Sequence, residues 1–152
     1  MTEEFLQIVF EGKRRLPKVR DCLSDHLREI LAMSSTEEAL LLEIALNEAL
    51  NNAMKAATAH EDSFAPLSCR ISVTMYVKHG KELIIRIKDP GEGFPFRDYI
   101  CQSDEVFRTG ELPESGLWAE SGRGILLMRA GVDTITYNKK GNVVTLQKRI
   151  HH

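Results

Sequence analysis

The chain has 152 residues, of which 43% are hydrophobic, so it is long enough for one globular domain with a real core and too short for two ordinary domains. Its 20 basic and 22 acidic residues are spread along the sequence without a basic block, which argues against a nucleic-acid partner. No apolar run approaches the roughly 20 residues of a membrane span, and the N-terminus is acidic where a secretory signal is basic. We therefore expect a cytoplasmic protein without a membrane partner.

The cysteines and histidines do not have the spacing of a metal site. Cys22, Cys69 and Cys101 lie far apart without a Cys-x-x-Cys pair, so we expect reduced thiols. We assign residues 1–150 to a single domain. Residues 151–152, both histidines, form a tail that can be the remnant of a purification tag.

The first third of the sequence predicts a strand followed by two helices. Residues 5–10 alternate weakly, as an edge strand does, and residues 16–30 carry apolar side chains at helical spacing. Ser35 and Glu38 then have the spacing of a capping box, which opens a long helix running to about residue 59.

The middle of the chain predicts an antiparallel strand pair and then a long irregular stretch. Residues 69–78 alternate between apolar and polar side chains, and His79-Gly80 can make a tight turn into a second strand at residues 82–88. From 89 to 124 the sequence is rich in Gly, Pro and charge, and this stretch is longer than most connections in a compact domain. We expect it to act as a lid over a ligand.

The last elements are a short helix and two strands. The helix covers residues 123–130, and the strands at 133–137 and 142–149 are joined by turn residues 138–141. This order predicts an α/β (α+β) two-layer sandwich, with helices on one face of a mixed, largely antiparallel sheet.

Three polar residues lie on one face of the long predicted helix. Glu48, Asn52 and Lys55 have helical spacing, which an ordinary solvated helix face would also show. The alanines around the rest of the helix, however, imply close packing over much of its circumference. A polar row among small residues favours a cavity.

Two glycine-containing segments add further candidates. Asp89 to Phe94 follows a strand, and its glycines allow close approach to a flat ligand, although a plain loop has the same composition. Residues 121–128 run from small residues into a helix and offer backbone N–H groups to a phosphate, although many helices begin this way. Together and in order, the three segments supply a metal ligand, base recognition and a phosphate site.

These segments resemble the sequence boxes of the Bergerat-fold ATPases, and most closely those of the anti-sigma-factor serine/threonine kinases. The similarity covers nearly the whole chain. The boxes have the forms Glu-x-x-x-Asn, Asp-x-Gly-x-Gly and Gly-x-Gly, and the residues that match them are Glu48 and Asn52, then Asp89, Gly91 and Gly93, then Gly122 and Gly124.

The resemblance implies ATP and Mg²⁺ as cofactors and gives each matching residue a role. Asn52 would ligate Mg²⁺, for which one protein oxygen is chemically sufficient, and Asp89 would accept a hydrogen bond from the adenine amino group. Glu48 would accept the proton of the attacking hydroxyl. The remaining residues would shape the base pocket (Gly91, Gly93), help to read adenine (Thr145) and lie along the phosphates (Gly122, Arg123, Gly124).

Two departures from the family pattern are visible. Kinases of this type often carry a histidine four residues after the asparagine, whereas this chain has Ala56 there and Lys55 before it, so Lys55 is expected to touch the phosphates. The lid at residues 96–120 is rich in acidic and apolar side chains, including Trp118, for which we favour a role as a partly buried anchor over stacking on the ligand.

By resemblance, the chain is expected to be an ATP-dependent serine/threonine protein kinase. It would act as an anti-sigma factor, bind a sigma factor, phosphorylate an anti-anti-sigma protein and form a homodimer through its sheet. The alternative is an ATP-binding module that captures a partner without phosphotransfer. A histidine kinase proper, a multidomain topoisomerase-like machine and a decayed nucleotide-binding fold fit less well. The helix at 16–31 is the surface expected to meet partners.

Overall fold

The computed structural model describes residues 5–32, 34–58, 70–91 and 123–150. In chain order the elements are β1 (Phe5–Glu11), the short 3₁₀ helix η1 (Lys13–Arg15), α1 (Leu16–Ile30), α2 (Thr36–Thr58), β2 (Arg70–Lys78), β3 (Glu82–Lys88), α4 (Arg123–Gly131), β4 (Thr134–Tyr137) and β5 (Val143–Arg149).

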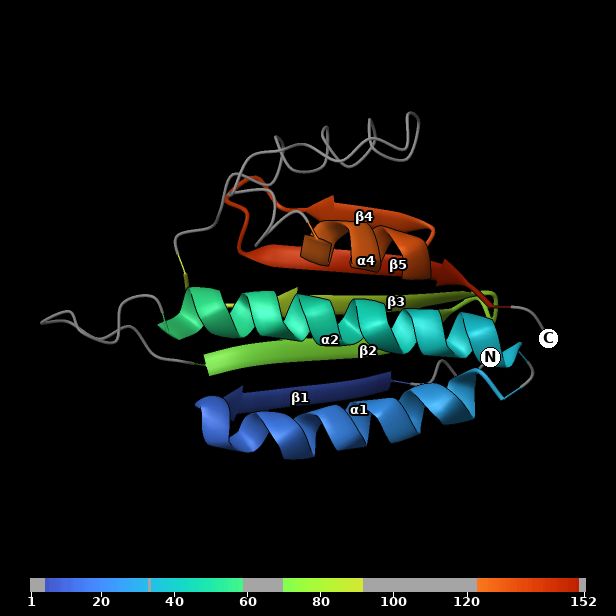
Figure 1. The fold of residues 1–152 in the computed structure, drawn as a ribbon, viewed down its shortest axis with the longest axis horizontal. Coiled ribbons are helices and arrows are strands. Elements are labelled where there is room, and N and C mark those ends of the chain that lie inside the picture. The colour runs from blue at the N-terminus through green and yellow to red at the C-terminus, as the bar shows by residue number, and fades with distance from the viewer. Residues whose placement is uncertain (1–4, 33, 59–69, 92–122, 151–152) are drawn as a thin grey trace, which may run out of the picture.

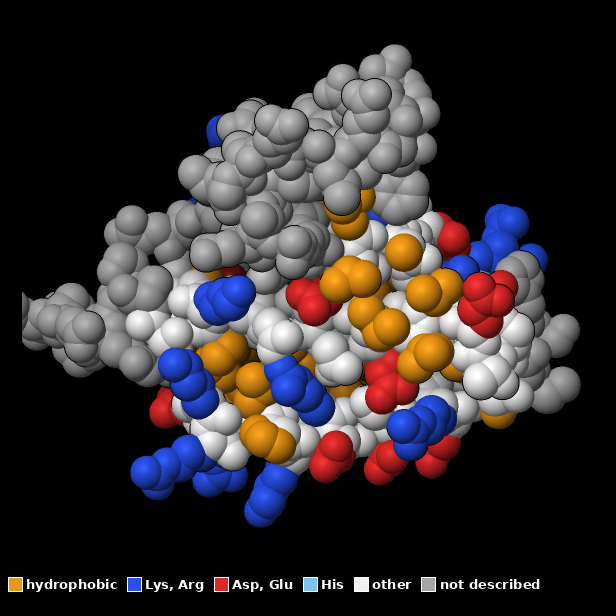
Figure 2. Space-filling view, viewed as in Figure 1, with side chains coloured by type: hydrophobic (Ala, Val, Ile, Leu, Met, Phe, Trp, Pro, Cys, Tyr) orange, Lys and Arg blue, Asp and Glu red, His pale blue; other side chains and the backbone are white. Residues whose placement is uncertain are grey.

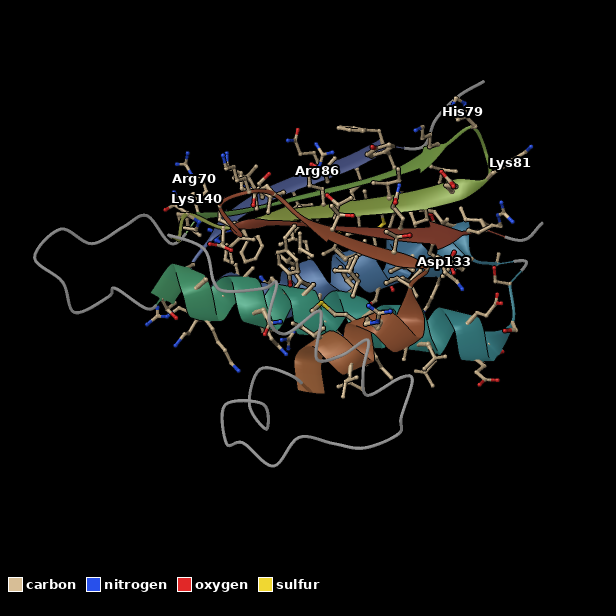
Figure 3. The ribbon with its side chains drawn as sticks, turned by 90° about the horizontal axis from the view of Figure 1, so that it is seen from above. Arg70, His79, Lys81, Arg86, Asp133 and Lys140 are labelled. Carbon is tan, nitrogen blue, oxygen red and sulfur yellow. The ribbon has the colours of Figure 1, made fainter. Side chains whose placement is uncertain are left out.

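The described strands form one sheet in the order β1-β2-β3-β5-β4. All four pairings are antiparallel, so the sheet that we expected to be largely antiparallel is fully so over the described strands. The described helices cover one face of this sheet, with α1 along β1, α2 over the centre and α4 over β5 (Figure 1). The predicted two-layer α/β sandwich is confirmed, and Figure 3 shows the two layers from the side.

Local sequence signals account for where the main elements begin and turn. α2 starts after Ser35, whose Oγ accepts a hydrogen bond from the backbone N–H of Glu38 at 3.1 Å, as the predicted cap requires. Between β2 and β3, His79 and Gly80 both have positive φ, 55° and 66°, which matches the twist of a tight hairpin. The predicted hairpin is therefore confirmed.

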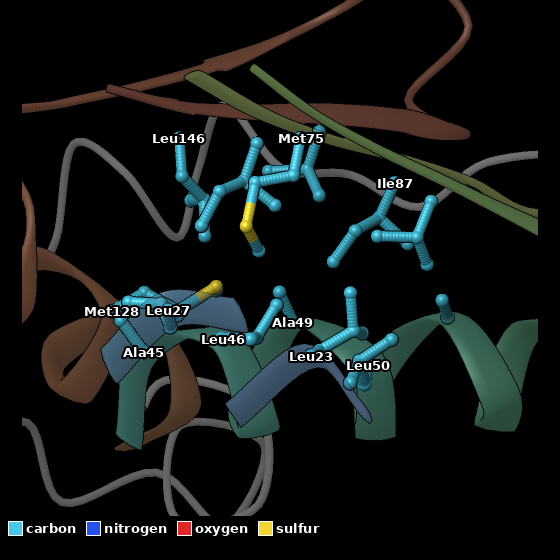
Figure 4. Packing of buried hydrophobic residues seen from close by; sticks show 14 of the residues in the cluster. Leu23, Leu27, Ala45, Leu46, Ala49, Leu50, Met75, Ile87, Met128 and Leu146 are labelled. Atoms are coloured by element: carbon cyan, nitrogen blue, oxygen red, sulfur yellow. The ribbon is translucent and has the colours of Figure 1, made fainter. Parts of the chain in front are cut away.

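The core lies between the sheet and α2. Leu46 and Leu50 from α2 are completely buried against Met75, Ile87 and Leu146 from three neighbouring strands (Figure 4). α2 also carries buried alanines, and these short side chains allow α4 to pack closely beside it. This packing fixes the positions of α2 and of the start of α4 relative to the end of β3.

The helix-covered face has an apolar area over α4 and the N-terminal half of α2, where Leu40 and Leu127 are exposed (Figure 2). Among the described helices, none combines the length and the apolar character that crossing a membrane requires.

Candidate nucleotide site

The start of α4 lies directly against the polar face of α2. Glu48 and Asn52 are half-buried on α2, one helical turn apart. A Cβ atom placed on Gly124 would lie 3.1 Å from Glu48 Oε2 and 3.5 Å from Asn52 Nδ2. The first and third predicted motifs therefore meet, and only glycine fits between them without displacing a side chain.

This junction suits an anion beside a metal ion. The first backbone N–H groups of α4, which begins at Arg123, have no partner within the helix, and they form the positive end of its dipole. Asn52 and Glu48 contribute an amide and a carboxylate oxygen nearby, and Mg²⁺ prefers such oxygen ligands together with phosphate. The described residues therefore fit a metal–phosphate group, which Asn52 would hold through its side-chain oxygen.

The second motif lies against the same face of α2, one turn further along the helix, beside Ala56. Asp89 follows β3, is only 9% exposed, and accepts a hydrogen bond from the Gly91 N–H through Oδ1 at 2.7 Å. A Cβ atom on Gly91 would lie 2.8 Å from that oxygen and 3.3 Å from the Ala56 Cβ on α2. Gly91 thus lets the backbone pass between Asp89 and the helix.

The Asp89 carboxyl group is buried, and its surroundings act on its pKa in opposite directions. Burial raises the pKa of its carboxyl group, while the Gly91 N–H and the positive charge of Lys140 act in the opposite direction. Burial, reinforced by the charge of Asp89, also raises the pKa of the nearby Tyr137 phenol, which stays neutral at physiological pH. In its ionised form a buried carboxylate only accepts hydrogen bonds, which suits recognition of a ligand N–H donor.

One small pocket connects the first and second motifs. Asn52 and Asp89 both line it, and its remaining walls come from α2, β3, β4, β5 and the turn between the last two strands: Ala49, Ala53, Ala56, Ile87, Tyr137, Gly141, Asn142 and Val144. Its volume of about 30 Å³ has room for roughly one water molecule.

The sequence reasoning missed two residues of this pocket. Asn142 is 9% exposed and donates a hydrogen bond from Nδ2 to the Asp89 carbonyl at 3.1 Å, and Tyr137 lies beside the same aspartate. Each stands next to the turn between the last two strands, where asparagine is common for purely local reasons. The available signal was an asparagine directly before the paired apolar residues that open β5, Val143 and Val144.

Thr145 is not brought to this pocket. On β5 the inward side chains are Val144 and Leu146, which are buried, whereas Thr145 lines a separate hollow on the helix-free face. Its partner in the sheet register, Arg86, projects from that same face (Figure 3). The expectation that Thr145 reads adenine is therefore corrected, because neighbouring residues of a strand point to opposite faces.

The other candidates are placed as follows. Lys55 is exposed on α2 and does not line the pocket described above. Of Arg123, the structure describes only its position as the first residue of α4. Gly93, Gly122 and the predicted lid at 96–120, with Trp118, lie outside the described residues.

Comparison with known proteins identifies the family. The comparison with curated proteins found no match. A family model described as "Histidine kinase-like ATPase domain" matches residues 11–148, a range that contains Glu48, Asn52, Asp89, Gly124 and every residue that lines the pocket. Such a domain binds ATP, in agreement with a site that combines an oxygen ligand, a helix N-terminus and a buried acceptor. The chain therefore belongs to the histidine kinase-like ATPase family.

Proposed function

We propose that the chain is an ATP-dependent serine/threonine protein kinase that acts as an anti-sigma factor and phosphorylates an anti-anti-sigma protein. The observation that carries this proposal is the position of Glu48, half-buried one helical turn from Asn52 and next to Gly124. A carboxylate beside the metal ligand and the phosphate-binding helix is placed to act as a base.

The proposed reaction transfers the γ-phosphoryl group to a protein hydroxyl. The hydroxyl oxygen forms a bond to the γ-phosphorus, the bond from the γ-phosphorus to the bridging oxygen breaks, and ADP leaves. Glu48 takes the hydroxyl proton, and the N–H groups at the start of α4 hold phosphate oxygens in place. When bound at Asn52, Mg²⁺ neutralises phosphate charge.

Glu48→Gln tests this role, because the amide keeps the shape of the side chain but is a much weaker base. We expect phosphotransfer from γ-labelled ATP to candidate anti-anti-sigma proteins to fall by about 100-fold or more, in the range that a general base contributes. ATP binding measured by calorimetry should stay within about threefold of the wild type.

Glu37→Gln is the control on the same helix, because Glu37 is exposed in the first turn of α2 and does not line the site. It should transfer phosphate normally. Undiminished transfer by Glu48→Gln would remove Glu48 from the mechanism. A wild type that binds ATP and holds its partner, but transfers phosphate to no candidate, would favour the partner-capture module instead.

We also propose α1 as the surface that meets the substrate protein and the sigma factor. Its outer side is charged, with Lys18 near its start and Asp21, Asp25 and Glu29 further along. Arg20 of α1 donates a hydrogen bond to Asn51, the residue before Asn52. A partner bound to α1 would therefore lie close to the proposed site.

A homodimer through the sheet is a further part of the proposal. β1 is an edge strand with Phe5 and Val9 exposed at 64% and 54% on the helix-free face. Large apolar side chains on an open sheet face favour contact with another protein surface.

A further inference from the structure

The turn between β4 and β5 is built around a single asparagine. Asn138 Oδ1 accepts hydrogen bonds from the backbone N–H groups of Gly141, Asn142 and Val143, at 2.9, 2.9 and 3.0 Å. Gly141 has a φ of 85°, which its lack of a side chain permits. One end of the Asn138 amide therefore closes the turn.

The other end of the same amide reaches toward the nucleotide pocket. Asn138 Nδ2 donates to Asn142 Oδ1 at 2.7 Å, and Asn142 Nδ2 donates to the Asp89 carbonyl at 3.1 Å. Because both ends of the Asn142 amide are engaged, its orientation is determined: its oxygen faces Asn138 and its nitrogen faces Asp89.

Asp89 is thereby held at three points. Its N–H donates to the Asn142 carbonyl at 3.0 Å, its own carbonyl accepts from the Asn142 side chain, and its Oδ1 accepts from the Gly91 N–H. Asp89 and Asn142 are both 9% exposed, and hydrogen bonds in such a buried network are stronger than in water. Two of these bonds hold the backbone of Asp89 and the third holds its carboxylate, so both the backbone and the side chain of this residue are constrained.

Fixing an accept-only group has a chemical consequence for the base that it meets. A carboxylate accepts hydrogen bonds, so it pairs with an amino group attached to a purine ring and repels a carbonyl oxygen attached at the same position. This discrimination depends on the carboxylate staying in place, because a movable side chain can turn away from the wrong base.

We propose that Asn138, acting through Asn142, is a positioning residue that sets base selectivity by fixing Asp89. The inference rests on the proposed role of Asp89 as the acceptor for the adenine amino group. It assigns the β4–β5 turn a part in discriminating between 6-amino and 6-oxo purine nucleotides, in addition to joining two strands.

Asn138→Asp separates the two roles of this side chain, which are closing the turn through Oδ1 and holding Asn142 through Nδ2. The aspartate keeps an oxygen for the three turn N–H groups but places a second oxygen against Asn142 Oδ1, so the Asn142 amide must flip or move and the Asp89 carbonyl loses its donor. Asn142→Asp breaks the next link and leaves the hydrogen bonds of the turn intact, which gives an independent variant if the first folds poorly.

The measurement is the dissociation constant of ATP and of inosine triphosphate, which carries an oxygen where adenine carries its amino group. We expect the wild type to prefer ATP by about 100-fold or more, and each variant to lower this ratio by about tenfold. The double variant should lower it no further, because the two residues act in one chain. Simple loss of structure would weaken both nucleotides equally and leave the ratio unchanged.

Lys139→Gln is the charge control, because it makes the same change of net charge on an exposed residue of the turn and leaves the amides in place. Its ratio should equal that of the wild type. Folded Asn138→Asp and Asn142→Asp variants with an unchanged ratio would overturn the inference. A wild type that binds neither nucleotide would instead overturn the assignment of the site, and one that binds both equally would remove both Asp89 as the base reader and the inference.

Discussion

At the residue scale, Gly124 places the third motif against the first, because it lies directly beside Glu48 and Asn52. An added methyl group would lie 3.1 Å from Glu48 Oε2, tighter than ordinary van der Waals contact, and would displace the carboxylate from its position beside α4. Glycine is otherwise a poor helix residue, so its presence here is better explained by the site than by the helix.

Gly124→Ala should therefore weaken the binding of Mg-ATP by about tenfold, equivalent to ~1.4 kcal/mol. Its free energy of unfolding should stay within about 1 kcal/mol of the wild type or rise, because alanine favours a helix. Calorimetry and urea unfolding measure the two quantities separately. Tight Mg-ATP binding by a stable Gly124→Ala variant would mean that the ligand does not use this junction.

Some residues of the site can be predicted from the sequence, and others cannot. Glu48, Asn52 and Asp89 stand in motifs with specific spacing. The face of the sheet to which Thr145 points could not be predicted in this way, because Val143 and Val144 are both apolar and either side chain could have pointed toward the core. Asn142 was missed because its role depends on Asp89, which lies 53 residues away in the sequence.

At the element scale, α4 is held on α2 by a close backbone contact at its other end. A Cβ atom on Gly131 would lie 2.2 Å from the Leu41 carbonyl oxygen and 2.9 Å from the Ala45 Cβ. The two helices touch here without an intervening side chain. This contact therefore determines the position of the N-terminus of α4 over Glu48 and Asn52.

Gly131→Ala should destabilise the protein by about 3 kcal/mol or more, since an atom so close to backbone cannot be accommodated without moving a helix. Gly124→Ala is the matched control, because it makes the same substitution in the same helix where only side chains are near. The urea midpoints of the two variants provide the comparison. A Gly131→Ala protein as stable as the wild type would contradict the described packing of α4 on α2.

Caps and turns made the elements themselves predictable. Ser35 and Glu38 located the start of α2, and His79 and Gly80 located the first hairpin, because both signals act over a few residues. The placement of β5 between β3 and β4 depends on contacts between distant segments, which local patterns do not encode.

At the scale of the whole molecule, the site occupies the junction between the two layers. α2 contributes Glu48 and Asn52, the sheet contributes Asp89 and Asn142, and α4 contributes its N-terminus. The core packing of α2 on the sheet sets the distance between these parts. We propose that this junction binds ATP through a Mg²⁺ ion held by Asn52.

The most direct test is calorimetric titration of ATP, with Mg²⁺ and with a chelator, into the wild type, Asn52→Ala and Asn47→Ala. Asn47 lies on the same helix but does not line the pocket, and its buried Oδ1 has no hydrogen-bond partner among the described residues, so its variant is a matched control. We expect Mg-dependent binding by the wild type and by Asn47→Ala, and affinity weakened by about tenfold or more in folded Asn52→Ala. Equal affinity in all three proteins, or no binding of ATP by the wild type, would contradict the claim.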